Sequence, residues 1–144
     1  MKRKNKGFTL TEIIIVLFLV SVAYLFTTRL LEYFNEIRAF RTRVKIVNAI
    51  NYIQNKAIYE NKGYEINFNL SNKKIKYIDN VITLDNKFDY ITKNKSNDFT
   101  RYTTKYGNFD KGFTIQIKRK NKLYYNIIVD TTNALNVPIV KVSK

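Results

Sequence analysis

The chain begins with one long apolar helical pattern. Between Phe8 and Thr28 the only charged residue is Glu12, and these 21 residues match the ~20 that a helix needs to cross a bilayer. Further on, apolar residues recur three and four positions apart, which is typical of one buried helix face; they are Leu30, Phe34, Ile37, Phe40, Val44, Val47, Ile50, Ile53 and Ala57. No glycine or proline interrupts residues 8–61, and Gly63 is expected to cap the helix. The pattern predicts a transmembrane half over residues 8–31 and an amphipathic continuation over residues 32–61.

After Gly63 the apolar spacing changes to two, which is typical of half-buried strands. The alternating positions are Tyr64, Ile66, Phe68 and Leu70, then Ile75 and Tyr77, then Phe113, Ile115 and Ile117, then Tyr125, Ile127 and Val129. Residues 79–110 predict only weak strands with long loops, and residues 137–142 predict a last strand that Pro138 places at an edge. The predicted fold class is therefore α+β: a long N-terminal helical spine, its first half transmembrane, packed on a small antiparallel β-sheet in residues 62–144.

Composition narrows the chemistry of the chain. It has no Cys, His or Trp, which removes disulfides, thiol or imidazole catalysis and Cys or His metal sites. An enzyme is not expected, and neither is a cofactor or a metal. The formal charge is +15, from 26 Lys and Arg against 11 Asp and Glu. Such an excess suits nucleic acid or an anionic membrane, although a general bias toward Lys, Asn, Ile, Tyr and Phe also accounts for it.

The residues before the span carry the most specific signal. Four basic residues precede Gly7 and Phe8; they are Lys2, Arg3, Lys4 and Lys6. Thr9 and Glu12 have the spacing of a capping box, in which each side chain binds the other's backbone N–H. A carboxylate at the edge of a span costs several kcal/mol unless it is paired, so something must favour Glu12.

This segment resembles the prepilin leader of type IV pilins and type II secretion pseudopilins. The resemblance covers residues 1–60 well and the rest loosely, with Gly107, Gly112 and Phe113 weakly similar to H-type minor pseudopilins. It implies that residues 1–7 are a leader, that prepilin peptidase cuts after Gly7, and that Phe8 is then N-methylated. Glu12, with Thr9 beside it, would serve processing and assembly by meeting the N-terminal amine of a neighbouring subunit. Thr11 replaces the aliphatic residue usual at that position.

The resemblance implies a structural minor subunit of a type IV pilus or type II secretion pseudopilus. Its expected partners are prepilin peptidase, other pilin or pseudopilin subunits, the inner-membrane assembly platform and the lipid bilayer. The basic leader predicts a cytoplasmic N-terminus and an extracytoplasmic C-terminal domain. The protein would thus be a single-pass protein of the inner membrane before it enters the filament.

Two alternatives remain open. One is a bitopic protein with a plain capped anchor and an unrelated β domain; a cleaved secretory peptide is disfavoured because no small-residue cleavage site follows the apolar run. The other is a competence-pilus component that contacts DNA through Arg38, Arg41, Arg43 and Lys45. The favoured interpretation of that cluster puts Phe40 in the core and the cations in solvent.

Two further sets of residues allow two interpretations each. Exposed tyrosines can stack on bases, but sheet positions are favoured for Tyr102, Tyr106, Tyr124 and Tyr125. Carboxylates can bind calcium, but solvated loop positions are favoured for Asp79, Asp85, Asp89 and Asp98.

Overall fold

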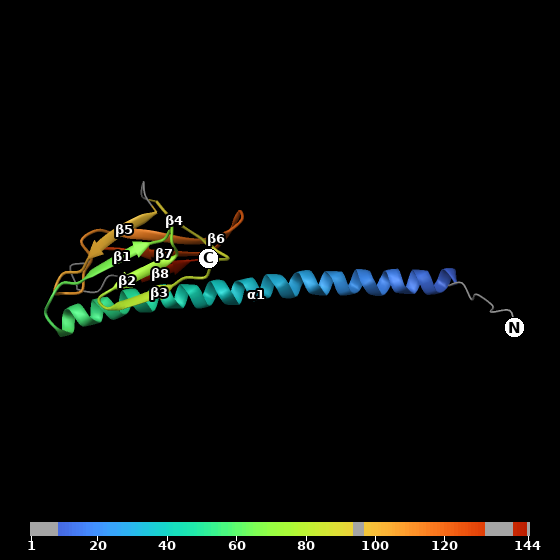
Figure 1. Ribbon diagram of the computed structural model, residues 1–144, viewed down its shortest axis with the longest axis horizontal. Helices are drawn as coiled ribbons and strands as arrows, with labels where there is room; N and C mark the ends of the chain where they lie inside the picture. Colours follow the sequence, from blue (N-terminus) through green and yellow to red (C-terminus); the bar gives the residue numbers. More distant parts are fainter. Residues whose placement is uncertain (1–8, 94–96, 132–139, 144) are drawn as a thin grey trace. The chain divides into compact units, whose positions relative to one another are not determined.

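The computed structural model describes residues 9–93, 97–131 and 140–143, and for residues 140 and 141 the backbone alone. The contacts divide the chain into two units, residues 1–36 and residues 37–144. The first unit holds the N-terminal half of helix α1, which runs from Leu10 to Tyr59, and the second holds the rest of α1 and the strands (Figure 1). The predicted fold class, a long apolar helix followed by antiparallel strands, is confirmed.

Eight strands follow α1 along the chain. They are β1 (Glu65–Asn69), β2 (Lys74–Tyr77), β3 (Asn80–Thr83), β4 (Asp89–Thr92), β5 (Asp98–Tyr102), β6 (Phe113–Arg119), β7 (Lys122–Val129) and β8 (Val140–Ser143). The predicted alternation is confirmed in β1, β2, β6 and β7, whose buried residues include Ile66, Phe68, Ile75, Ile115 and Ile127. Pro138 lies outside the described residues.

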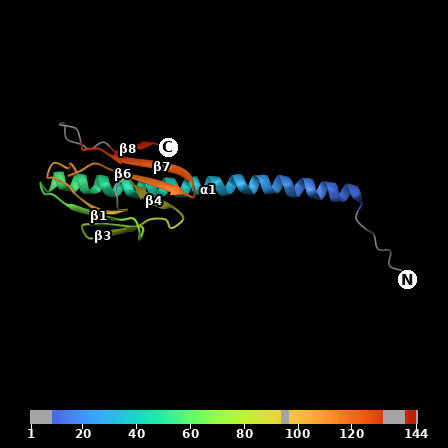
Figure 2. The same ribbon diagram turned by 90° about the horizontal axis from the view of Figure 1, so that it is seen from above.

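The strands form two antiparallel sheets rather than one. Sheet A has the order β3-β2-β1-β5 and sheet B the order β4-β6-β7-β8. Both lie over the C-terminal half of α1, with sheet B along one side of the helix and sheet A along the other (Figures 1 and 2). The strands β3, β4 and β5 come from residues 79–110, where the sequence pattern is weak because several of their residues remain exposed.

The buried face of α1 differs from the predicted stripe in its first half. The helix buries Ala39, Thr42, Ile46, Ala49, Ile50, Ile53, Gln54 and Ala57. Phe40 is 46% exposed, so the expectation that it faces the core is wrong. Ala39, Thr42 and Ala49 are small side chains on the buried face, whereas the bulky Phe40 lies on the exposed flank. The predicted positions Ile50, Ile53 and Ala57 are buried.

The end of α1 also differs from prediction. Asn61, not Gly63, takes the left-handed conformation after the last turn, with φ 51°. Lys62 N donates to the Ala57 carbonyl at 3.1 Å, and Asn61 N to the Ile58 carbonyl at 3.3 Å. These two bonds are the Schellman pattern, which satisfies carbonyls that the helix end leaves without partners. Gly63 is needed for another reason: a Cβ there would lie 2.5 Å from the Thr103 carbonyl oxygen.

An aromatic cluster joins the two sheets above the helix. Phe68 of β1 is fully buried, stacks on Phe99 at 4.7 Å between ring centroids, and lies 5.1 Å from Phe113 of β6. Phe109 adds an edge-to-face contact with Phe113 at 5.4 Å. Burying aromatic side chains supplies much of a small domain's stability, so this cluster holds sheet A against sheet B.

Candidate processing and assembly segment

The first turn of α1 is a capping box, as the sequence predicts. Thr9 N donates to Glu12 Oε2 at 2.7 Å, and Glu12 N donates to Thr9 Oγ1 at 3.3 Å. The Thr9 hydroxyl also donates to Glu12 Oε2 at 3.0 Å. The two hydrogen bonds that the Glu12 carboxylate accepts, from Thr9 N and from the Thr9 hydroxyl, both end on Oε2. The box fixes the Glu12 carboxylate beside the helix N-terminus, where the helix dipole favours a negative charge.

The helix that follows is apolar on all sides. Residues 10–34 are exposed apart from a partly covered Val22, although most are large apolar side chains. Ser21, Thr27 and Thr28 donate their hydroxyls to carbonyls three or four residues earlier, at 2.8–2.9 Å, so these polar groups are satisfied within the helix. Within the described part of the chain, α1 is the one helix long and apolar enough to cross a membrane.

Gly7 and Phe8 lie outside the described residues. Information on this part of the chain therefore comes from the comparison with known families. The family model for the prokaryotic N-terminal methylation motif matches residues 2–23. The match supports a type IV pilin-like family for this chain. The matched segment contains the basic leader, the Gly7-Phe8 junction, the capping box and the first half of the span. No curated protein and no solved structure matches the chain.

The methylation motif has implications for processing, assembly and location. It implies processing by prepilin peptidase and assembly with other pilin subunits. Proteins of this type are structural rather than enzymatic. The motif and the apolar helix together fit a protein anchored in the inner membrane.

The four basic residues after the span do not form one surface. Arg38, Arg41 and Lys45 are exposed, and their spacing of three and four residues places them along one flank of α1. We call these three residues the basic stripe. Arg43 points elsewhere: its guanidinium carbon lies 4.5 Å from the Phe40 ring centroid and 5.1 Å from that of Tyr125. Arg43 is therefore partly a packing residue, which sequence spacing could not reveal.

The four tyrosines separate into two pairs. Tyr124 and Tyr125 are buried, because the β6–β7 pairing shifts between Ile117 and Lys118 and turns both rings inward. Tyr102 and Tyr106 are more than half exposed. The sheet interpretation is confirmed for Tyr124 and Tyr125, which leaves them unable to stack on bases.

The four acidic residues differ in position: Asp79 and Asp85 lie between strands as expected, whereas Asp89 and Asp98 are the first residues of β4 and β5 rather than loop residues. Asp85 Oδ1 accepts from Lys87 N at 2.9 Å, and Asp98 Oδ1 accepts from Ser71 N at 2.8 Å. Among the described residues, no three acidic side chains group closely enough to hold a metal ion. These carboxylates serve turn geometry instead.

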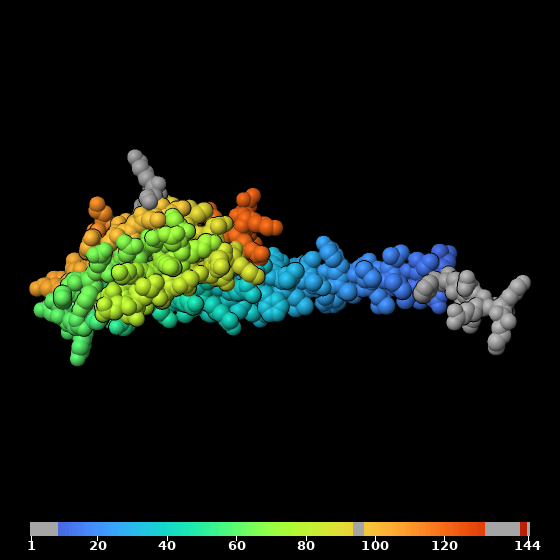
Figure 3. Space-filling view, viewed as in Figure 1, coloured from blue at the N-terminus to red at the C-terminus, as the bar shows by residue number. Residues whose placement is uncertain are grey.

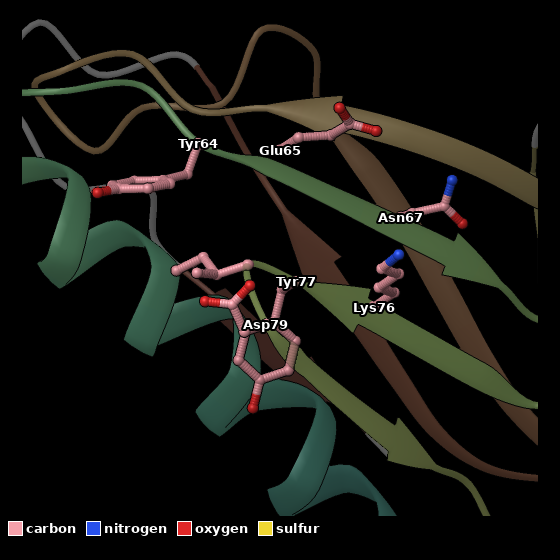
Figure 4. A pocket seen from close by; sticks show the side chains of 7 residues that line it. Tyr64, Glu65, Asn67, Lys76, Tyr77 and Asp79 are labelled. Carbon is pink, nitrogen blue, oxygen red and sulfur yellow. The ribbon is translucent and has the colours of Figure 1, made fainter.

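The structure contains a cleft that the sequence did not predict, along the strands β1 and β2 and the residues that flank them. It has a volume of about 470 Å³ and is lined by Tyr64, Glu65, Asn67, Lys76, Tyr77, Ile78 and Asp79 (Figure 4). The green to yellow-green part of the chain that supplies these residues faces the viewer in Figure 3. We call it the tyrosine cleft. The Tyr77 ring contacts Tyr52 of α1 at 5.9 Å between centroids, and the Lys56 ammonium lies 5.5 Å from the Tyr64 ring. The cleft thus joins residues far apart in the sequence.

At one side of the cleft, Tyr64 donates a hydrogen bond to Glu60, which is also 3.6 Å from Lys56. The bond from Tyr64 holds the pKa of Glu60 below its usual value, and the same bond raises the pKa of Tyr64. At the rim, Ile78 has φ 51°, a left-handed conformation that is strained for a β-branched residue. Ile78 and Asp79 form the two-residue turn between β2 and β3, and such hairpin turns need a positive φ at their first residue.

Proposed function

We propose that the chain is a structural minor subunit of a type IV pilus or of a type II secretion pseudopilus. The methylation motif, followed by a helix that opens on the capping box and is apolar on all sides, is the observation that supports it most. In this proposal residues 1–7 are the leader, residues 8–31 the transmembrane half of the helix, residues 32–61 its amphipathic continuation, and residues 62–144 the β domain.

The capping residues have defined roles in this proposal. Cleavage after Gly7 creates a cationic amine on Phe8, which is then N-methylated and remains a cation. Glu12 keeps Oε2 in the capping box and offers Oε1 to the amine of a neighbouring subunit. In a low-dielectric surrounding this pairing offsets the cost of two isolated charges. Thr9 holds the carboxylate in the orientation that the pairing needs.

The N-terminal segment also predicts how the subunit is placed in the membrane. The basic leader keeps the N-terminus in the cytoplasm, and the β domain lies outside. The helix lies in the bilayer until the inner-membrane assembly platform transfers the subunit to the filament. The small β domain, stabilised by one aromatic cluster and no disulfide, suits a minor subunit.

The experiment is an intact mass and an N-terminal peptide analysis of the protein from its native membrane. A chain starting at N-methylated Phe8 supports the proposal. A retained leader in the presence of active prepilin peptidase refutes it and favours the plain bitopic protein. A Gly7→Ala variant is the matched control, because it should keep the leader while leaving the capping box and the β domain intact.

The basic stripe supports a second candidate, a competence-pilus component that binds DNA. Arg38, Arg41 and Lys45 are exposed on one flank and make no ion pair with any described residue. Phosphate contacts release counterions, so replacing all three by Gln should lower the slope of log K against log salt by ~3. The assay is DNA binding by the detergent-solubilised chain across a salt series. An unchanged slope would exclude the stripe as a DNA contact.

A further inference from the structure

We infer that the tyrosine cleft receives the basic stripe of a second copy of this chain when subunits assemble. The inference rests on the proposed function, because it needs copies that meet in a filament. It commits to the helix flank carrying Arg38, Arg41 and Lys45 as the occupant of the cleft. Three features support this contact: the unpaired charges on both surfaces, the residues that line the cleft, and the position of the cleft along α1.

Unpaired carboxylates are scarce in this chain. Among the described residues, Glu65, Asp79 and Asp89 are the carboxylates that make neither a hydrogen bond nor an ion pair. Glu65 and Asp79 line the same cleft, and Figure 4 shows the Asp79 carboxylate beside Tyr77 while Lys76 extends toward Asn67. The lining thus carries two carboxylates against one lysine, in a chain with 26 cationic residues against 11 anionic ones, and the Lys56 and Lys62 ammoniums lie 5.5 and 5.8 Å from the Tyr64 ring centroid.

The basic stripe has the complementary property. Its three cations are exposed and make no ion pair with the described residues. Arginine also binds the faces of aromatic rings, so a guanidinium between Tyr77 and Asp79 would gain both a ring contact and a carboxylate. Net repulsion between two cationic copies is screened beyond about 8 Å at physiological salt, so the local contacts decide.

Anionic lipid is a poorer occupant for the stripe. Arg38 follows Leu31, the last residue of the proposed transmembrane half, by seven positions, or about 10 Å of helix. Lys45 lies about 21 Å beyond Leu31 by the same rise. Both distances exceed the screening length, so headgroup charge would act weakly on these two residues. The surface of a second protein can contact Arg38 and Lys45 directly, so screening does not weaken that interaction.

The place of the cleft along α1 determines how the two copies are related. The helix residues in contact with its lining are Tyr52 and Lys56, which follow Arg41 by 11 and 15 positions. At 1.5 Å per residue the two surfaces are therefore staggered by about 17–22 Å along the helix. Copies in register put cation opposite cation, so the contact forms only between staggered copies.

The two surfaces lie on the same flank of α1, so the second copy must also be turned to face the first. A stagger combined with a turn is a screw operation. Each copy then uses its stripe toward one neighbour and its cleft toward the next. Such a heterologous contact does not close and extends into a filament.

The test uses the absence of cysteine from the chain, which makes an introduced pair unique. Two differently tagged full-length copies carry Arg41→Cys and Asp79→Cys and are expressed with the native assembly machinery. A short bismaleimide is used, because an Arg–Asp pair holds backbones further apart than the roughly 4.4–6.8 Å between Cα atoms of a disulfide. The expected product is a doubly tagged dimer, at least tenfold above the matched control that pairs Arg41→Cys with Asp89→Cys.

Charge reversal gives an independent readout. Asp79→Lys in all copies should reduce incorporation into the sheared filament fraction several-fold, and adding Arg41→Glu should restore it. Asp89→Lys, the third unpaired carboxylate, should have no effect. Equal cross-linking to positions 79 and 89, cross-linking of Arg41→Cys to a different protein only, or no rescue would each overturn the inference.

The N-terminal peptide of the same sample separates the two proposals. A processed Phe8 terminus without the dimer overturns the contact and leaves the pilin-type function standing. A retained leader overturns the function and, with it, the contact. Copies carrying Gly7→Ala provide the control, because they should remain in register in the membrane and give no dimer.

Discussion

Replacing Gly63 by alanine tests how the helix end is tied to the sheet. A Cβ at this position would lie 2.5 Å from the Thr103 carbonyl oxygen, which is backbone and cannot rotate away. Ordinary contact needs about 0.9 Å more. The same strand ends share two backbone-donated bonds, Thr103 N to the Tyr64 carbonyl at 2.8 Å and Tyr64 N to Thr103 Oγ1 at 2.9 Å. A shift of that size breaks both.

The expected cost of Gly63→Ala is about 2 kcal/mol, taking ~1 kcal/mol for each lost hydrogen bond. For a domain of about 100 residues this lowers Tm by roughly 8 °C. The measurement is thermal unfolding of the detergent-solubilised chain, followed by near-ultraviolet circular dichroism. The matched substitution is Asn61→Gly, which should be neutral or slightly stabilising because glycine suits the left-handed cap.

The opposite ranking would refute this reasoning. If Gly63 were the helix cap, Gly63→Ala would cost only ~1 kcal/mol through backbone strain, and Asn61→Gly would destabilise a regular helical turn by a similar amount. A Tm change below 2 °C for Gly63→Ala would show that β1 and β5 yield without losing their bonds. The close approach of residue 63 to Thr103 would then contribute nothing measurable to the free energy of unfolding.

Four further substitutions have expected outcomes. Ile78→Gly should raise Tm by about 4 °C, because it removes roughly 1 kcal/mol of strain at φ 51°, and a lower Tm would show that the side chain packs more than it strains. Phe68→Ala should cost about 3–5 kcal/mol and abolish cooperative near-ultraviolet unfolding; full retention of the transition would contradict the aromatic core. Arg43→Gln should lower Tm by a few degrees through its lost ring contacts, while Arg41→Gln should leave it unchanged. Tyr64→Phe should remove a stabilisation that exists only between two pH limits. The Glu60 pKa is lowered, so its share is present above about pH 4.3 and lost as pH falls through the lowered value. The Tyr64 pKa is raised, so its share is present below about pH 10 and lost as pH rises through the raised value. The difference in Tm between wild type and variant should therefore vanish at both ends of a pH series.

The sequence by itself determined the N-terminal segment, which consists of the capping box and the apolar helix that follows it. Glu12, Thr9 and the apolar run are contiguous, and a capping box or a membrane-length helix depends on near neighbours alone. The strands with strict alternation, such as β1 and β6, were predictable for the same reason, since a period of two identifies a strand whose one face is buried. These features require no knowledge of the rest of the chain.

The tertiary structure decided what depends on distant residues. Ala39 rather than Phe40 faces the core because two sheets approach the helix, and a spacing of three and four residues does not say which of two adjacent stripes is buried. Gly63 meets Thr103 across 40 positions, and Tyr124 is buried by a bulge that belongs to the pairing of two strands. The tyrosine cleft likewise exists only where β1 and β2 pair. Local patterns specify local elements, whereas contacts between elements set which face is covered and which charges are left for a partner.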